Sequence, residues 1–321
     1  MDLDATLGVL RRGAGDPTSH REPGGAWWLA RRTPDGSGTL RLAVRRDEGV
    51  VEARSWGPGA QWLLGRVPAL LGADDDPSGF EPPAAPRLAA AAARFPGWRV
   101  PATGLIVDSL VPAIIEQRVT GAEAFASQRM LVHRFGSPAP GPTPPGGRVL
   151  RVAPSAGEWR RVPSWEWVRA GVDSGRAGTV MRAVAVAGRL EECVGQPPEL
   201  LRRRLLAIPG IGGWTAAEVA QRAVGDADAV SFGDYHVAAD VTWALTGTIG
   251  DDAALERVLR PWAGHRYRVQ RLVALAGLQR PRRGARRSLP TPRASTEVTV
   301  TPSRGGSYGT PMACDRAAAP A

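Results

Sequence analysis

The sequence predicts a mixed α+β fold that is mainly α, with a small antiparallel sheet at the N-terminus and a large helical region after it. Before residue 85, short runs with strand-like alternation are separated by turn-forming residues. From residue 86 onward, apolar residues recur at three- and four-residue steps between Gly- and Pro-rich breaks, which is the period of an amphipathic helix. We therefore divide the chain into an N-terminal α+β domain over residues 1–85, a helical domain over residues 86–280 and a tail over residues 281–321.

The N-terminal region contains three candidate strands and one longer candidate helix. The strands are expected at Ala26–Arg32, Gly38–Arg45 and Val50–Ser55, and Pro34-Asp35-Gly36 forms a turn between the first two. The segment Gly59–Leu71 places its apolar residues at helical spacing. We expect this helix to cover one face of the sheet.

The helical region shows its clearest pattern at Val107–Val119, where the apolar spacing predicts a buried helix. Pro138–Pro145 reads as a Pro- and Gly-rich loop. Further helices are expected near Trp165–Ala170, Gly175–Ala187, Pro198–Ala207, Trp214–Val224, Val237–Leu245 and Asp252–Gly277. From Pro281 onward the composition is dominated by Arg, Pro, Ser, Thr, Gly and Ala, which bury too little apolar surface to offset the loss of chain entropy. We expect this basic tail to be disordered.

The composition excludes several classes of protein. All 41 basic residues are Arg, so the chain has no lysine for a Walker phosphate loop or for Schiff-base chemistry. Its two cysteines cannot build a disulfide framework, a four-cysteine zinc site or a four-cysteine iron–sulfur cluster. The net charge of +10 makes nucleic acid a candidate partner, although about +6 of it lies in Arg280–Ala321.

The start of the chain gives no sign of export. Met1–Arg12 carries Asp2 and Asp4 and lacks the apolar core of a secretory signal. No apolar run approaches the roughly 20 residues that a membrane span requires. We therefore expect a soluble cytoplasmic protein without membrane contact.

The most informative stretch is a Gly-rich turn between two candidate helices, with the sequence Ile208-Pro209-Gly210-Ile211-Gly212. Glycine permits positive φ and lets the backbone approach a ligand closely. The turn leaves unpaired amides at the start of the second helix, where they and the helix dipole favour a phosphate. This pattern predicts a grip on the DNA backbone that is independent of base sequence. The alternative is an ordinary helical corner, in which Ile208 and Ile211 only fill the core.

A second motif, Ser231-Phe232-Gly233-Asp234-Tyr235, places Asp234 after this turn, 22 positions beyond Gly212. In isolation, Asp234 would be read as the N-cap of a helix that begins near Tyr235. Together, the two motifs resemble the helix-hairpin-helix (HhH-GPD) DNA glycosylase superfamily, and most of all its DNA-3-methyladenine glycosylase II branch. The upstream segment Ala113–Val119 is similar to the helix that these enzymes bring to the minor groove.

The resemblance implies a helical domain with two lobes that meet at the hairpin and at Asp234, with Asp234 as the catalytic residue. Physical chemistry agrees with that role. Cleavage of an N-glycosidic bond builds positive charge on the sugar, so a nearby carboxylate stabilises the transition state and can orient the attacking water. One carboxylate suffices when alkylation has already made the base a cationic leaving group.

The resemblance also implies that Trp214, Glu218 and Gln117 line the pocket for the flipped base. Trp214 would stack against an electron-poor alkylpurine, and its alternative is a Trp buried in a helical core. The resembled enzymes carry an aromatic residue where this chain has Glu218. Its carboxylate would either face a cationic base or complete a capping box with Thr215. Gln117 would face the base that is left without its partner.

Arg118 matches the position of the apolar wedge in the resembled enzymes. Its guanidinium plane would fill the vacated stack, and a phosphate contact is the alternative. The other residues that the motifs place at DNA are Ile208, Gly210, Ile211, Gly212, Gly213, Thr215 and Tyr235.

The sequence thus predicts a monofunctional base-excision-repair glycosylase for alkylated purines of the 3-methyladenine and 7-methylguanine type in duplex DNA, acting as a nucleoid-associated monomer. Bifunctional members of the superfamily carry a lysine two positions after the second hairpin glycine, where this chain has Trp214. No cofactor or metal is expected, apart from a monovalent cation that the resemblance allows at the hairpin carbonyls. The alternatives are a non-catalytic DNA-binding protein with the same hairpin and a glycosylase for another lesion class.

Overall fold

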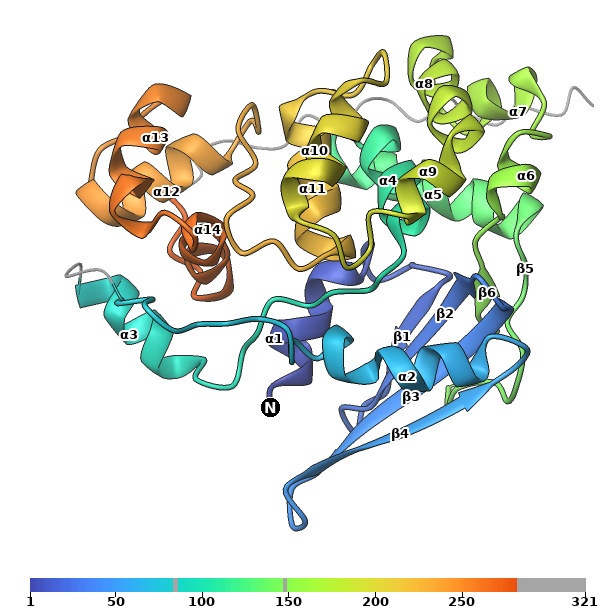
Figure 1. Cartoon of the computed structure of the whole chain (residues 1–321), viewed down its shortest axis with the longest axis horizontal. Coiled ribbons are helices and arrows are strands. Elements are labelled where there is room, and N and C mark those ends of the chain that lie inside the picture. The colour runs from blue at the N-terminus through green and yellow to red at the C-terminus, as the bar shows by residue number, and fades with distance from the viewer. Residues whose placement is uncertain (83–85, 147–148, 282–321) are drawn as a thin grey trace, which may run out of the picture. The chain divides into compact units, whose positions relative to one another are not determined.

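The computed structural model describes residues 1–82, 86–146 and 149–281, of which Met1–Arg280 belong to one unit. This unit is mainly helical and carries a four-stranded antiparallel sheet near its N-terminus, which confirms the predicted fold class (Figure 1). The predicted disordered tail lies outside the described residues from residue 282 onward. No helix among the described residues has both the length and the apolar character to cross a bilayer.

The sheet consists of β1 (Ser19–Arg21), β2 (Trp27–Thr33), β3 (Gly36–Arg45) and β4 (Val50–Trp56), in that order, and is covered by α1 (Leu3–Leu7) and α2 (Ala60–Leu70). Leu29 pairs with Leu40 across β2 and β3, and both side chains join Leu63 of α2 in one apolar core. The three predicted strands and the predicted helix are confirmed within two residues. Strand β1 was not predicted, because a three-residue strand is too short to show alternation.

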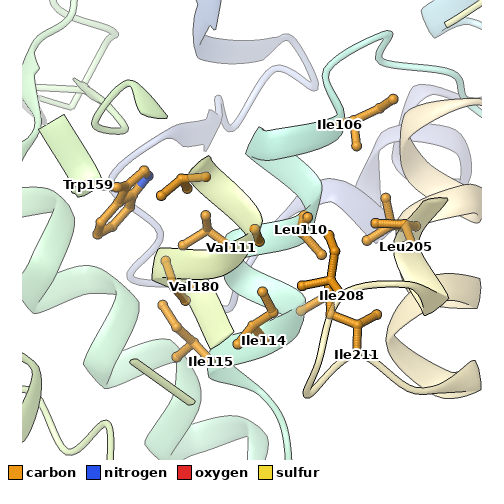
Figure 2. Packing of buried hydrophobic residues seen from close by; sticks show 14 of the residues in the cluster. Ile106, Leu110, Val111, Ile114, Ile115, Trp159, Val180, Leu205, Ile208 and Ile211 are labelled. Carbon is orange, nitrogen blue, oxygen red and sulfur yellow. The ribbon is translucent and has the colours of Figure 1, made fainter. Parts of the chain in front are cut away.

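Helix α4 (Ile106–Ile115) forms the centre of the larger helical lobe. It contacts α8 (Ser174–Ala185) and α11 (Gly213–Ala223), and its apolar side chains share one core with theirs and with those of α10 (Pro198–Leu206), which packs against α11 (Figure 2). The predicted helix over residues 107–119 was too long, because the chain turns after Ile115. Arg118 lies in this turn with φ of 57°, a left-handed conformation that cannot continue an α-helix.

The remaining elements match the predicted ranges only in part, because the helices Pro86–Arg94, Gly121–Phe135, Ala156–Trp159 and Ala187–Glu191 had no predicted range of their own. These remaining elements are α3 (Pro86–Arg94), α5 (Gly121–Phe135), β5 (Ser137–Pro138), β6 (Arg151–Val152), α6 (Ala156–Trp159), α7 (Ser164–Arg169), α9 (Ala187–Glu191), α12 (Val237–Thr246), α13 (Asp252–Leu259), α14 (Arg266–Leu275) and the 3₁₀ turns Gly8–Leu10 and Arg260–Trp262. The single helix predicted over Asp252–Gly277 was wrong. Pro261 follows α13 and Gly264 has φ of 90°, so the chain bends before α14 begins.

Two apolar cores divide the helical part into two lobes. The larger core surrounds α4, and the smaller one joins α3, α12, α13 and α14 through Leu88, Val241, Leu255 and Leu272. This confirms the predicted two-lobed arrangement. Helix α11 belongs to the larger lobe and α12 to the smaller, so residues 224–236, which connect them, bring Asp234 to the junction of the lobes (Figure 1).

Candidate active site

The turn between α10 and α11 is held in place by its own apolar side chains. Ile208 and Ile211 are 7% and 6% exposed and pack in the core around α4 (Figure 2). Their side chains therefore lie away from solvent, and any contact of these two residues with DNA would use their backbone. Gly210 has φ of 96°, and a Cβ there would lie 2.2 Å from Thr179 Oγ1, so only glycine fits.

The start of α11 presents open backbone donors. Gly212 is the N-cap and contributes no side chain, and within the described parts of the chain no group accepts from the amides of Gly213, Trp214 or Thr215. A Cβ built at Gly212 or Gly213 would meet nothing within 4 Å, so the surface outside these amides is open. Such a helix start has the geometry and the dipole to bind a phosphate oxygen.

The turn after α4 is hydrogen-bonded to the hairpin that α10, α11 and the turn between them form. Gln117 Nε2 donates hydrogen bonds to Gly210 O at 3.1 Å and to Thr215 Oγ1 at 2.9 Å. The Thr215 hydroxyl thus faces inward, leaving only its amide for DNA. Arg118, next to Gln117, is exposed and is the one non-glycine residue with positive φ in the described ranges. Such a conformation costs about 1–3 kcal/mol and persists only where its neighbours hold it.

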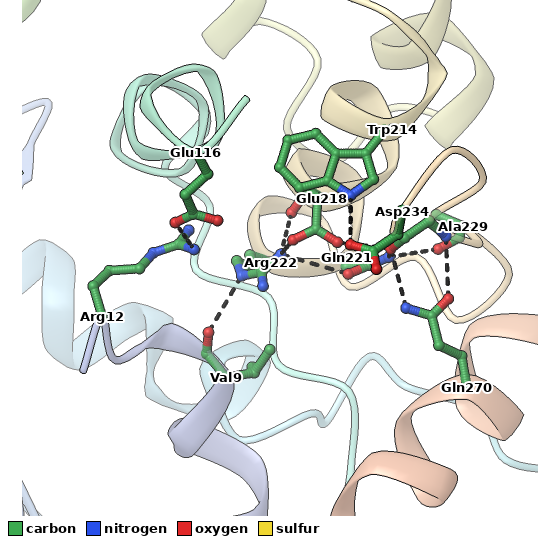
Figure 3. Close-up of polar contacts among 11 residues, drawn as sticks. Val9, Arg12, Glu116, Trp214, Glu218, Gln221, Arg222, Ala229, Asp234 and Gln270 are labelled. Carbon is green, nitrogen blue, oxygen red and sulfur yellow. Dashed lines mark hydrogen bonds and ion pairs between the residues drawn. The ribbon is translucent and has the colours of Figure 1, made fainter. Parts of the chain in front are cut away.

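The Asp234 carboxylate is fixed by three donors. Its Oδ1 accepts from the amides of His236 at 2.7 Å and Val237 at 3.1 Å. Its Oδ2 accepts from Trp214 Nε1 at 3.1 Å (Figure 3). Helix α12 begins at Val237 rather than near Tyr235, but the two amide contacts correspond to the capping role weighed from the sequence. Asp234 is half-buried, so its carboxylate combines a fixed orientation with access from solvent.

The two aromatic candidates occupy different environments. Trp214 is half-buried and its indole N–H is bonded to Asp234, so it is not a Trp enclosed in the core. Tyr235 is 87% exposed and its ring meets His236 edge to face, with 4.8 Å between ring centroids. The structure therefore brings Trp214 to the carboxylate and leaves Tyr235 free on the surface.

Glu218 is engaged inside the protein. Its Oε2 lies 2.7 Å from Arg222 Nη1, and its Oε1 accepts from Ser231 Oγ at 2.6 Å (Figure 3). Burial raises the pKa of Glu218, but the charge of Arg222, the Ser231 hydroxyl and the charge of Arg12 outweigh it, so the net pKa lies below the ordinary value of 4.5. The capping-box alternative was wrong, because Thr215 lies inside the first turn of a helix whose N-cap is Gly212.

Several residues around Asp234 were missed from the sequence. Ser231, Gln221 and Gln270 form a buried hydrogen-bond cluster behind the Asp234 turn. The four-residue spacing of Glu218 and Arg222 was a usable signal, because residues at that spacing share one face of a helix. No local signal pointed to Gln270, which comes from a distant helix.

The site offers little to a metal ion. Among the described residues, no group of three or more His, Cys, Asp or Glu side chains is placed to hold one. The carbonyl oxygens of Pro209 and Gly210 accept hydrogen bonds from Arg182 Nε and Gln117 Nε2. A monovalent cation at the hairpin would therefore depend on its other carbonyls, and this site stays a prediction.

A cavity of about 280 Å³ lies elsewhere, between the sheet and the larger helical lobe. Arg31, Asp108 and Trp159 contribute to its wall, whereas Trp214 and Asp234 do not. Burial raises the pKa of Asp108 although the Arg31 guanidinium lies 3.3 Å away. Arg222, the ion-pair partner of Glu218, also lines this cavity, so the cavity adjoins that buried ion pair but does not include the Asp234 carboxylate.

Comparison with known proteins finds curated relatives that match part of the chain and solved structures with a similar fold. No family model matches the chain. Two curated relatives from Mycobacterium tuberculosis strains, each named a probable bifunctional transcriptional activator/DNA repair enzyme AlkA, are 30% identical over 173 residues. That segment covers 53% of this chain and 34% of the relatives, so the chain matches about a third of their length.

Solved structures show the same fold over most of the chain. A 3-methyladenine DNA glycosylase from Archaeoglobus fulgidus superposes with a TM-score of 0.65 at 18% identity, covering 84% of this chain and 94% of that one. An 8-oxoguanine glycosylase/lyase from Clostridium acetobutylicum, in complex with double-stranded DNA, superposes with a TM-score of 0.62 at 10% identity, covering 86% and 91%.

Proposed function

We propose that this chain, which has the fold of the helix-hairpin-helix DNA glycosylases, hydrolyses the N-glycosidic bond of alkylated purines in duplex DNA as part of base-excision repair. The observation that carries the proposal is the Asp234 carboxylate, fixed by Trp214 Nε1 and two backbone amides at the junction of the two lobes. A protein that only bound DNA would gain nothing from a carboxylate near phosphates.

The hairpin would hold the DNA. The open amides at Gly213 and Trp214 would donate hydrogen bonds to a phosphate oxygen, and the clear space outside Gly212 would let the backbone approach it. The Gln117 hydrogen bonds to the hairpin would hold the Arg118 turn at a fixed position relative to the bound phosphate. Arg118 would then insert into the base stack at the position that the flipped base has left. Binding and base extrusion would thus be coupled by direct contacts.

Asp234 would act on the deoxyribose. As the bond from C1′ to the base nitrogen breaks, the bonding electrons leave with the base, and the sugar becomes positively charged. The fixed carboxylate would stabilise that charge, and it would accept the proton of the water that attacks C1′. An alkylated purine already carries positive charge, so it leaves as a neutral base without protonation.

Two observations favour alkylated purines and a monofunctional reaction. The Trp214 ring beside Asp234 offers a π-surface for an electron-poor base. The chain has no lysine, so no side-chain amine is present to form a Schiff base with the sugar. The names of the curated relatives and of the Archaeoglobus structure support alkylation damage, whereas the Clostridium structure is that of an 8-oxoguanine glycosylase/lyase.

The direct test is release of bases from defined duplexes. Methylated DNA should yield free 3-methyladenine and 7-methylguanine, and duplexes with 8-oxoguanine opposite cytosine should yield no free base under the same conditions. Release of 8-oxoguanine alone would assign the chain to the oxidised-purine class. Binding of damaged duplex without release of any base would identify a non-catalytic DNA-binding protein.

A further inference from the structure

We propose that Glu218 and Ser231 are positioning residues for Asp234, and that the buried Glu218 carboxylate fixes the turn that presents Asp234 to the sugar. This inference rests on the proposed catalytic role of Asp234. It assigns a role to the acidic residue that stands where the resembled enzymes have an aromatic one. Glu218 would act through Ser231 rather than on the base.

The turn from Ser231 to Asp234 is the direct support of the carboxylate. The Asp234 amide donates to Ser231 O at 3.2 Å, which closes the turn. Gly233 lies within it with φ of 83°, and its amide donates to Asp252 Oδ2 at 2.8 Å. The position of Asp234 is therefore set by where Ser231 is held.

The Ser231 side chain is held in place because its hydroxyl uses all of its hydrogen-bonding sites. Its Oγ donates to Glu218 Oε1 at 2.6 Å and accepts from Gln221 Nε2 at 2.8 Å and Gln270 Nε2 at 3.0 Å. A hydroxyl has one donor and two acceptor sites, so every site is used. The Ser231 amide also donates to Gln270 Oε1 at 3.1 Å. With a side chain only 1% exposed, Ser231 has no water to replace a lost partner.

The charge on Glu218 determines which groups of this cluster donate hydrogen bonds and which accept them. An ionised carboxylate can only accept, so the Ser231 hydroxyl must donate to it and must receive both glutamine amides. Arg222 keeps Glu218 ionised through the 2.7 Å ion pair, and Arg222 Nε is itself anchored on Val9 O at 3.2 Å (Figure 3). A neutral amide at position 218 could donate as well as accept, so the cluster would no longer have a single arrangement of hydrogen-bond donors and acceptors.

The cluster also spans the two lobes. Glu218 and Gln221 come from α11 in the larger lobe, whereas Gln270 comes from α14 in the smaller one. Ser231 is bonded to all three, so the Asp234 turn is fixed against both sides at once. A displacement of about 1 Å at a reacting group can lower a rate by about 100-fold, so such a support matters for catalysis.

Two variants and one matched control test the proposal in the full-length protein. Ser231→Ala removes the hydroxyl, and Glu218→Gln removes the charge while keeping the shape. The control is Thr242→Val in α12, which deletes a hydroxyl that is 2% exposed, donates to Ala238 O at 2.7 Å and accepts from Gly250 N at 2.8 Å. It has the same chemistry as Ser231 but no contact with the Asp234 turn.

The first measurement is amide hydrogen exchange at His236 and Val237, whose amides bind the Asp234 carboxylate. We expect exchange to rise about tenfold in Ser231→Ala and Glu218→Gln and to stay near wild type at these amides in Thr242→Val. Unchanged exchange in both cluster variants would overturn the proposal. This measurement needs no substrate.

The second measurement separates rate from binding. We expect the single-turnover excision rate on methylated duplex to fall about 10- to 100-fold in both cluster variants, while the Kd for undamaged duplex changes less than about threefold. Thr242→Val should keep the wild-type rate. Equal loss of rate in all three variants would contradict positioning. If wild-type protein releases no base, the proposed glycosylase function fails, and the exchange measurement still decides whether Glu218 and Ser231 fix the Asp234 turn.

Discussion

Trp214 Nε1 donates a hydrogen bond to Asp234 Oδ2 at 3.1 Å, which ties the first turn of α11 to the turn that precedes α12. Trp214 carries one of the open amides of the hairpin, so the same residue belongs to the expected phosphate grip and contacts the expected catalytic carboxylate. In the proposed function, this one short segment would set the distance between the DNA backbone and the carboxylate. Most of the predictions below follow from this link.

Replacing Trp214 by Phe keeps an aromatic ring and removes the donor to Asp234. We expect the single-turnover excision rate to fall about tenfold, because the carboxylate loses one of three hydrogen bonds and its orientation loosens. Affinity for damaged duplex should stay within about threefold of wild type, because a π-surface is retained. Wild-type rates in Trp214→Phe would show that the indole N–H is dispensable.

Gly212 offers a clean test of the phosphate grip. A side chain there meets nothing within 4 Å, so Gly212→Glu should fold and place a negative charge beside the open amides. We expect affinity for every duplex, damaged or not, to fall about tenfold at low salt. Gly65→Glu adds the same charge at an equally open, exposed position in α2 and should bind DNA like wild type. Equal affinities of the two variants would contradict the grip.

The buried pair of Glu218 and Arg222 predicts a dependence of stability on pH. The net pKa of Glu218 is lowered in the folded state, so its ionised form stabilises the fold above about pH 4.5, and this gain is lost as the pH falls through the lower folded-state pKa. At pH 7 we expect Glu218→Gln to lower the free energy of unfolding by about 3 kcal/mol. Denaturant titrations should show this difference shrinking below pH 4.5. A difference that grows on acidification would reverse the assigned sign.

The absence of lysine predicts that no side chain forms a Schiff-base intermediate with the sugar. Borohydride reduction during turnover on lesion-containing duplex should trap no protein–DNA crosslink, and the abasic product should break only after added alkali. The guanidinium of arginine stays protonated at working pH and cannot replace the missing amine. A stable crosslink would contradict monofunctional hydrolysis.

The sequence predicted the parts of the site that depend on local chain geometry. The hairpin follows from Gly210, whose positive φ excludes other residues, and from Ile208 and Ile211, which fill the core. The end of α4 was misplaced because the apolar pattern continues through Val119, although the backbone turns at Arg118. Apolar spacing reports which side chains are buried, and it does not report where a helix stops.

The polar support of Asp234 could not be read from local patterns. Glu218 is bonded to Ser231, 13 positions away, and Ser231 to Gln270, 39 positions away. Such contacts exist only because the two helical lobes meet, and no spacing rule encodes that meeting. The sequence therefore predicted which carboxylate to examine, and the fold was needed to find what holds it.

The most direct test of this account is the excision rate of Asp234→Asn. The amide keeps the size of the side chain and one acceptor oxygen, so the fold and the affinity for undamaged duplex should stay near those of wild type. Because the charge matters chiefly in the transition state, the single-turnover release of 3-methyladenine should fall at least about a thousandfold. Retention of more than about a tenth of the wild-type rate would remove Asp234 from the catalytic role and contradict the account.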